Sequence, residues 1–221
     1  MKAYFPRTPN FIMRVFSKYI WRFSFNKKEI YLTFDDGPTI EVTEFVLREL
    51  QKHNAKATFF CIGKNITNHP EIFKKTLLEG HSIGNHTQNH LKGWKHSTED
   101  YLKNVFECEN IITNTIETTK NLTFKPQESK LFRPPYGKIK KSQAKKILKK
   151  GYKIIMWSVL SADFDLTITK EKCLENVLQN TKNGSIIVFH DSLKASEKLK
   201  YVLPKVLDFY SKKGFTFKAI C

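Results

Sequence analysis

The pattern of apolar and polar residues along the chain predicts buried strands that alternate with helices. Short apolar runs that stop at turn-forming residues are typical of buried strands. We expect strands at 30–34, 57–61, 81–85, 131–132, 153–160, 185–189 and 215–220. Helical periodicity with matching start and stop signals predicts helices at 42–52, 70–79, 97–116, 142–150, 170–180 and 193–210. The polar stretch 117–130, which contains Pro126, is expected to be a loop.

This alternation favours one architecture. Strands that alternate with helices indicate a parallel sheet with helices outside it. About seven such strands fit an irregular (β/α) barrel better than a two-layer sheet. The chain has 221 residues and shows no internal repeat or linker. We therefore expect an α/β fold with one catalytic domain at 27–221, preceded by an N-terminal extension, 1–26, that packs on the barrel.

The N-terminal extension carries an amphipathic pattern at 11–23. Its apolar residues recur at helical spacing, which predicts a short basic helix. Packing across one end of the barrel is the favoured interpretation, and contact with a membrane surface is the alternative. Arg14 interrupts the early apolar run, and no stretch has the roughly 20 apolar residues of a membrane span. The absence of a signal peptide predicts a cytoplasmic location, with peripheral membrane attachment and export by another route left open.

The chain is strongly basic, with 38 Lys and Arg against 21 Asp and Glu and a net charge of +17. The basic residues are spread along the chain and are densest at 140–150, where they suit one solvated helix face. No nucleic-acid-binding motif accompanies them, so no specific nucleic acid partner is expected. The charge serves solubility or a weak association with an anionic surface. The four cysteines form no CxxC pair and are expected to be reduced thiols. A monomer is favoured.

Polar residues follow several of the predicted strands. A site in this architecture is expected beyond the carboxyl ends of the strands. Asp35 and Asp36 follow the first strand, and His86 and His90 follow the third. Two histidines four residues apart in a helical turn would place both imidazoles on one side. One Asp would complete three ligands for a divalent metal and leave a position for water, while the other Asp is free to accept a proton. Amide hydrolysis also needs a proton donor, and His190, at the end of a later strand, is the candidate.

Five motifs carry a resemblance to a known family. They are TFDDGP at 33–38, HTQNH at 86–90, RPPYG at 133–137, WSVLSADF at 157–164 and IIVFHD at 186–191. In this order they resemble the polysaccharide deacetylases, the NodB-type carbohydrate esterase family. The resemblance covers about residues 30–220. It implies a metal-dependent hydrolase that removes N-acetyl groups from GlcNAc-containing glycans, such as peptidoglycan or chitin-like oligosaccharides.

The resemblance also implies roles for residues at the motif positions. Asp35 matches the general base and His190 the general acid, and Asp36, His86 and His90 match the metal ligands. Zinc suits such a site best, and Co²⁺, Ni²⁺ or Mn²⁺ can enter it.

Further positions match supporting roles in the family. Arg133 matches the arginine that holds the base carboxylate, and Asp163 matches the carboxylate that orients the acid histidine. Tyr136 matches the residue whose backbone N–H stabilises the oxyanion. Val188 matches the residue that lines the pocket for the acetyl methyl group. Separately, Trp94 is either a sugar-stacking platform or a residue that packs in the core of a loop.

Three positions depart from the family pattern. Leu160 stands where the fourth motif has its first Asp, Phe164 stands where it has Trp, and Val188 stands where Leu is usual. An aromatic wall remains at position 164. The metal-ligand positions and both acid/base positions are intact, so we expect an active enzyme with an acetylated carbohydrate substrate. The departures leave two alternatives: a glycan-binding protein with a vestigial site, or a deacylase of a different acylated amide or ester.

Overall fold

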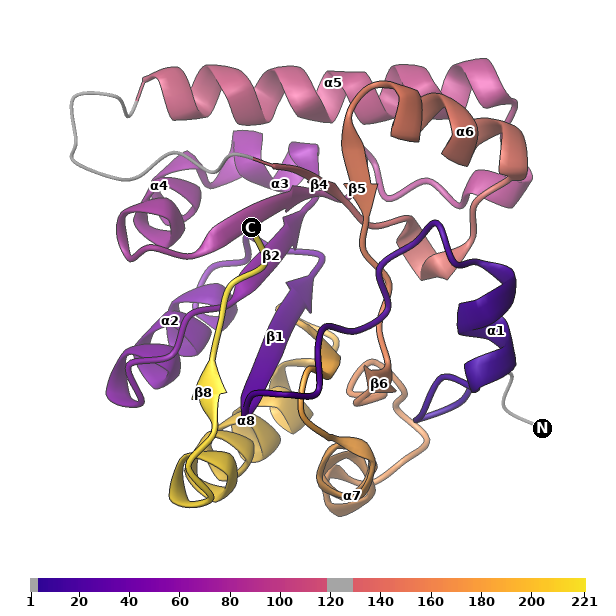
Figure 1. The fold of residues 1–221 in the computed structure, drawn as a ribbon. Helices are drawn as coiled ribbons and strands as arrows, with labels where there is room; N and C mark the ends of the chain where they lie inside the picture. The colour runs from indigo at the N-terminus through magenta and orange to yellow at the C-terminus, as the bar shows by residue number, and fades with distance from the viewer. Residues whose placement is uncertain (1–3, 119–128) are drawn as a thin grey trace.

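A curled sheet of seven parallel strands lies at the centre of the molecule (Figure 1). The computed structural model describes residues 4–118 and 129–221. The strands run in the order β5-β4-β3-β2-β1-β7-β6, and β8 pairs with β1 off this path. Their bounds are β1 Glu29–Asp35, β2 Thr58–Cys61, β3 Ser82–Asn85, β4 Lys130–Phe132, β5 Tyr152–Ile154, β6 Val159–Leu160, β7 Ile186–His190 and β8 Thr216–Phe217. The path is open between β5 and β6, so the expected irregular α/β barrel is confirmed.

Helices surround this sheet (Figure 1). They are α1 Asn10–Val15, α2 Val42–Lys52, α3 Gly63–Asn68, α4 Pro70–Leu78, α5 Thr98–Glu117, α6 Lys141–Lys149, α7 Lys170–Asn180 and α8 Ser196–Lys212, with 3₁₀ turns η1 Gly93–Lys95 and η2 Pro135–Gly137. The sequence did not predict α3. Most of the loop expected at 117–130 lies outside the described residues. Across 4–118 and 129–221, no helix combines the length and apolar character that crossing a bilayer requires. All four cysteines are free, as expected.

Alternation along the strands decides which side chains reach the interior of the barrel. On β1, Phe34 joins the core beneath the outer helices, so its neighbour Asp35 faces inward. On β7, Phe189 joins the same outer core, so His190 faces inward. A smaller apolar cluster fills the interior, and it consists of Phe60, Leu131, Ile155, Ile186 and Ile220. The inward face therefore carries apolar residues along its length and ionisable residues at its carboxyl end.

The single strand expected at 153–160 is wrong, because two short strands, β5 and β6, occupy this range. β5 pairs with β4, whereas β6 pairs with β7. Between them, the carbonyls of Ile155 and Met156 accept hydrogen bonds from Arg133 at 3.1 and 3.0 Å. The buried guanidinium thus takes up two carbonyls that would accept hydrogen bonds from a neighbouring strand if 153–160 were one strand. At these two residues the chain stops pairing with β4, and it then pairs with β7.

The N-terminal segment is helical only at α1, so the helix expected over 11–23 is wrong beyond Val15. Ile20 instead accepts from the N–H of Met156 at 2.7 Å and donates to the carbonyl of Ile154 at 2.9 Å. Isolated bridges join Arg7 to Val159 and Arg22 to Ser185. β5 and β6 do not pair with each other. The N-terminal segment therefore runs along the open side of the barrel, between these two strands.

Candidate metal and catalytic site

The carboxyl edge of the sheet collects the polar residues that the motifs single out. Asp35 ends β1 and His190 ends β7, and the two residues face each other in the strand register. His86 directly follows β3, and Arg133 directly follows β4. Because parallel strands end at one edge, residues more than 150 positions apart in the sequence lie together here.

Asp36, His86 and His90 form a compact cluster. Each offers one potential ligand atom within 4.8 Å of those of the other two. Asp36 Oδ1 lies 3.2 Å from His90 Nε2 and 3.7 Å from His86 Nε2. The helical turn expected at 86–90 is wrong. Left-handed conformations at Thr87 (φ 67°) and His90 (φ 55°) bring the two imidazole centroids to 5.1 Å instead.

The orientation of His86 is fixed by the backbone. Its Nδ1 lies 2.8 Å from the carbonyl oxygen of Arg133. A carbonyl can only accept, so Nδ1 carries the proton and Nε2 presents its lone pair toward Asp36. Burial lowers the pKa of His86 to about 4, although Asp35 raises it. The imidazole is therefore neutral at neutral pH, which is the form that binds a metal.

The environment of Asp36 shows whether this cluster fits a cation. Its Oδ1 is buried and has no hydrogen-bond partner among the described residues. Burial raises the pKa of Asp36, but the contact with His90 and the charge of His190 lower it overall. An ionised carboxylate oxygen that lies close to two imidazole nitrogens and accepts no hydrogen bond from the described residues belongs to the donor set of a divalent metal site. The residues present therefore fit a divalent ion.

Arg133 holds the second carboxylate in place. Its guanidinium has no exposed surface, and Nη1 donates to Asp35 Oδ1 at 2.6 Å and to the hydroxyl of Thr33 at 2.7 Å. Such charge-assisted bonds are short and directional. The Cζ atom of the guanidinium also lies 4.1 Å from the ring centroid of Phe60. Asp35 is thus fixed on the inward face of the barrel, next to Asp36 of the metal cluster.

His190, the neighbour of Asp35 in the strand register, is paired with Asp163. Asp163 Oδ1 lies 2.8 Å from His190 Nδ1, and Asp163 Oδ2 accepts the backbone N–H of His190 at 2.7 Å. Burial lowers the pKa of His190, but the charge and hydrogen bond of Asp163, helped by Asp36 and Asp35, raise it to about 9. His190 therefore keeps both ring protons at neutral pH, and its Nε2–H is available as a donor.

The remaining predicted site residues lie at the walls of this region. The Tyr136 ring centroid lies 4.6 Å from that of His90, on a left-handed backbone (φ 60°). Phe164 meets the His190 ring edge-on at 5.1 Å between centroids. Val188 is buried on the face of β7 that carries His190. The structure thus places an aromatic wall beside the candidate acid, as expected from the residue type at position 164.

Trp94 lies on the surface, in η1, with 55 % of its area exposed. Its Nε1–H donates to the carbonyl of Ile139 at 3.1 Å, and Lys138 Nζ lies 4.1 Å from its ring. Packing in the core of a loop is therefore the wrong interpretation of Trp94. Its role as a sugar-stacking platform stays a prediction.

Two residues that sequence reasoning missed support the loop that carries the aspartates. Asp191 is buried and accepts the N–H of Gly37 at 3.0 Å and the hydroxyl of Thr43 at 2.6 Å. Burial raises the pKa of Asp191 to about 7. Asn65, on α3, donates to the carbonyl of Asp36 at 2.7 Å. The position of Asp191 inside the last motif was a signal for its role, whereas Asn65 lies on a helix that the sequence did not predict.

Comparison with known proteins decides the family. The family model for polysaccharide deacetylase matches residues 23–155. This chain belongs to the polysaccharide deacetylase family. A peptidoglycan-N-acetylglucosamine deacetylase of Bacillus cereus is 37 % identical over 177 residues, which is 79 % of this chain and 61 % of that relative. A second deacetylase of that description, also from Bacillus cereus, is 32 % identical, and the match covers 90 % of each chain.

Other relatives of this polysaccharide deacetylase extend the comparison. A chitooligosaccharide deacetylase of Azorhizobium caulinodans is 33 % identical over 80 % of each chain. The crystal structure of a peptidoglycan N-acetylglucosamine deacetylase superposes with a TM-score of 0.84 at 32 % identity, and covers 96 % of this chain and 95 % of that chain. The family is metal-dependent in general, which agrees with the cluster of Asp36, His86 and His90.

Proposed function

We propose that this protein is a metal-dependent deacetylase that hydrolyses the N-acetyl group of GlcNAc units in a glycan. The observation that carries the proposal is the arrangement at the carboxyl edge: a three-ligand cluster, with Asp35 held by Arg133 and His190 held by Asp163 as neighbours at the ends of β1 and β7. Asp36, His86 and His90 would hold a divalent ion, which would polarise the acetyl carbonyl and make a water more acidic. Zinc is the favoured ion for this donor set.

Asp35 is the proposed general base. Its carboxylate accepts from Arg133 and faces inward next to Asp36, so it stands beside the place where the attacking water binds. The guanidinium is fixed by three further bonds and holds the carboxylate without taking the proton itself. Asp35 accepts the proton of the water as the water attacks the acetyl carbon.

His190 is the proposed general acid. Breaking the C–N bond requires a proton on the leaving amine. His190 is protonated at neutral pH because Asp163 raises its pKa, and Asp163 also occupies Nδ1, so Nε2 donates. The backbone N–H of Tyr136, in its left-handed turn beside His90, is the proposed donor to the developing oxyanion. Val188 and Phe164 are the proposed contacts of the acetyl methyl group.

The substrate class follows from the relatives. Those of at least 30 % identity include deacetylases named for peptidoglycan N-acetylglucosamine and for chitooligosaccharide. Both names describe polymers or oligomers that carry N-acetylglucosamine. We infer the same sugar for this chain, with Trp94 as an exposed platform for a neighbouring unit.

Acetate release tests this proposal. The metal-loaded protein should release acetate from chitooligosaccharides and from peptidoglycan fragments, and a chelator should stop the release. Asp35→Asn and His190→Gln should each lose most turnover, by at least roughly 100-fold, whereas His96→Gln, a histidine outside the cluster, should keep it. Equal activity of wild type and Asp35→Asn would contradict the proposed base. No release by the metal-loaded wild type, together with sugar binding, would favour the vestigial, glycan-binding alternative.

A further inference from the structure

Residues 6–8 of the N-terminal segment pair with the edge of β6. Two backbone hydrogen bonds hold them there, from the N–H of Leu160 to the carbonyl of Pro6 at 2.8 Å and from the N–H of Thr8 to the carbonyl of Ser158 at 3.0 Å. An antiparallel bridge joins Arg7 to Val159 between these two bonds. Because β6 runs directly into the end of the fourth motif, this pairing fixes the start of the backbone that carries Asp163.

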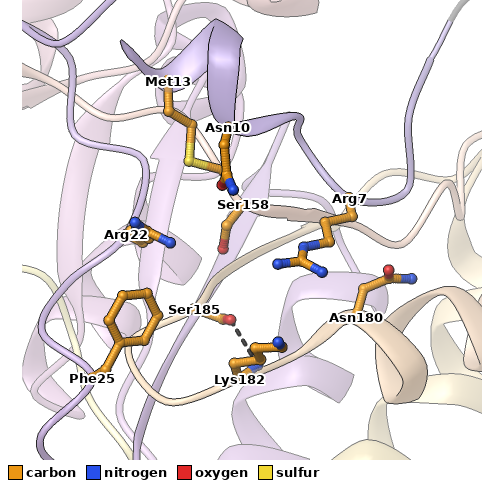
Figure 2. A pocket seen from close by; sticks show the side chains of 9 residues that line it. All are labelled: Arg7, Asn10, Met13, Arg22, Phe25, Ser158, Asn180, Lys182 and Ser185. Carbon is orange, nitrogen blue, oxygen red and sulfur yellow. Dashed lines mark hydrogen bonds between the residues drawn. The ribbon is translucent and has the colours of Figure 1, made fainter.

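Burial alternates along residues 4–8. Tyr4, Pro6 and Thr8 are buried or half-buried, whereas Phe5 and Arg7 are exposed. This period of two is typical of a strand that has one face on the body of the protein. On the outer face, Arg7 lines a pocket together with Arg22 and Lys182 (Figure 2). On the inner face, the segment brings Tyr4 to the fourth motif.

Tyr4 contacts the end of the fourth motif in two ways. Its ring meets the Phe164 ring edge-on, at 5.8 Å between centroids. Its hydroxyl donates to Oδ2 of the next residue, Asp165, at 2.6 Å. Burial and this hydrogen bond raise the pKa of Tyr4 well above its usual range, so the hydroxyl keeps the proton that it donates. Tyr4 is thus anchored through its hydroxyl while its ring packs on Phe164.

Phe164 connects this contact to the candidate site. Its ring also meets the His190 ring edge-on. Its N–H donates to Asp163 Oδ1 at 3.0 Å, and the same oxygen pairs with His190 Nδ1. A phenyl ring is smaller than the indole that the family pattern has at this position, and it has no N–H that could hold it by a hydrogen bond. The orientation of Phe164 therefore depends on the rings that contact it.

We propose that Tyr4 is a positioning residue that fixes the Phe164 ring beside His190 and thereby restricts the site to small acyl groups. This inference rests on the proposed function, because it concerns the acyl group that the deacetylase removes. Without the Tyr4 ring, Phe164 loses a contact that selects one of its rotamers. The Phe164 ring then turns away and leaves room for a longer acyl chain. Tyr4 acts through Phe164 in this scheme and is not itself a catalytic residue.

The preference for short acyl chains tests the proposal with the full chain loaded with Zn²⁺. The value of kcat/KM is measured for N-acetyl chitooligosaccharides and for the same oligosaccharides with N-butyryl groups. The wild type should prefer the acetyl group, and Tyr4→Ala should lower that preference by roughly 10-fold, since each methylene in an apolar pocket contributes on that order. Tyr4→Phe keeps the ring and should keep most of the preference. The matched control is Phe5→Ala, which removes the neighbouring exposed ring and should leave the preference unchanged.

The His190 ring gives a second readout, which does not require turnover. The ring current of Phe164 shifts the proton NMR signal of His190 Cε1–H, and the signal is identified by its loss in His190→Gln. Tyr4→Ala should move this signal, whereas Phe5→Ala should not. Circular dichroism reports whether each variant is folded. Tyr4→Leu, which keeps apolar volume at position 4 but has no aromatic ring, carries the same expectations where Tyr4→Ala is poorly folded.

The contrary outcomes are distinct. An acyl preference that Tyr4→Ala leaves unchanged, together with a lower Tm, would limit Tyr4 to a role in stability and overturn the proposal. An equal loss of preference in Phe5→Ala would assign the effect to the whole segment and overturn it as well. A wild type that hydrolyses neither substrate would contradict the proposed function instead. The His190 signal would then still decide the positioning, because a signal that Tyr4→Ala does not move would overturn it.

Discussion

The guanidinium of Arg133 donates from Nη1 to Asp35 Oδ1 at 2.6 Å, inside the barrel and out of contact with solvent. The same side chain bonds the hydroxyl of Thr33 and the carbonyls of Ile155 and Met156. One buried cation therefore connects β1, the end of β4 and the segment between β5 and β6. It orients the proposed base and also decides where the sheet changes partner.

Replacing this cation should be costly for stability. Arg133→Met leaves the Asp35 carboxylate buried and unpaired, and we expect the free energy of unfolding to fall by about 3–5 kcal/mol. Urea denaturation followed by circular dichroism measures the change. Adding Asp35→Asn removes the unpaired buried charge, so the double variant should recover part of the lost free energy of unfolding. A double variant that is less stable than Arg133→Met alone would contradict an ion pair as the source of the effect.

The pair of His190 and Asp163 predicts how activity depends on pH. Asp163 raises the pKa of His190 to about 9, so the proposed acid is protonated below that pH and loses its proton as the pH rises through it. Asp163→Asn removes the main favourable charge and lowers the pKa of His190. The alkaline decline of kcat should then move to lower pH, with the metal held at saturation. An alkaline decline at the same pH in both proteins would mean that another group controls it.

The metal cluster predicts a stability gain on metal binding. An ion that binds only the folded protein at 100 times its Kd adds about 2.7 kcal/mol to the free energy of unfolding. Zn²⁺ should therefore raise Tm in thermal scans, and a chelator should reverse the rise. Asp36→Asn and His90→Gln should each reduce this shift, since each removes one ligand of the cluster. His96→Gln is the control, and a loss of the shift in that variant would point to binding elsewhere.

Asp191 predicts a second support for the site. Asp191→Ala leaves the N–H of Gly37 and the hydroxyl of Thr43 without their acceptor, at a cost of about 1–3 kcal/mol in stability. Because Gly37 follows directly on Asp36, the metal affinity and kcat should fall as well. Calorimetric metal titration and acetate release measure both. Asp208→Ala, an exposed aspartate on α8, is the matched control. Unchanged metal affinity in Asp191→Ala would limit Asp191 to a role in stability.

Local patterns predicted most of the sheet and the residues at its edge. Asp35 and Asp36 follow an apolar run that stops at a turn, so the sequence predicted both the strand and the position of the two aspartates at its end. The spacing of His86 and His90 predicted that their side chains would meet, but it did not predict the backbone conformation that brings them together. Their segment folds back through left-handed conformations at residues other than glycine, and the residue types at these positions do not predict a positive φ.

Long-range contacts account for what the sequence did not predict. The run 153–160 is apolar throughout most of its length, and no residue within it marks the break. The break depends on Arg133, which lies 22 and 23 positions before the carbonyls that it binds. The extended course of Ile20 depends in the same way on backbone groups of Ile154 and Met156. In both places tertiary hydrogen bonds override a local preference.

His81 predicts a loss of stability in mild acid. Its side chain is buried, and Nδ1 accepts the N–H of Ala57 at 3.2 Å, which only an unprotonated Nδ1 can do. Burial, and then the charge of Lys56, lower the pKa of His81 to about 3. In the unfolded chain the same group titrates near pH 6.5, so below that pH the unfolded state binds a proton that the folded state does not. Stability is thus lost as the pH falls from about 6.5 toward 3, by about 2 kcal/mol at pH 5.

The variant His81→Gln isolates this contribution. Glutamine keeps an acceptor and cannot titrate, so the drop in unfolding free energy between pH 7 and pH 5 should shrink by about 2 kcal/mol relative to wild type. Urea denaturation at both pH values measures the two drops. His86, whose pKa burial also lowers, is present in both proteins, and its contribution cancels in the comparison. If the two proteins lose the same free energy between these pH values, His81 is not the group that makes the fold sensitive to acid.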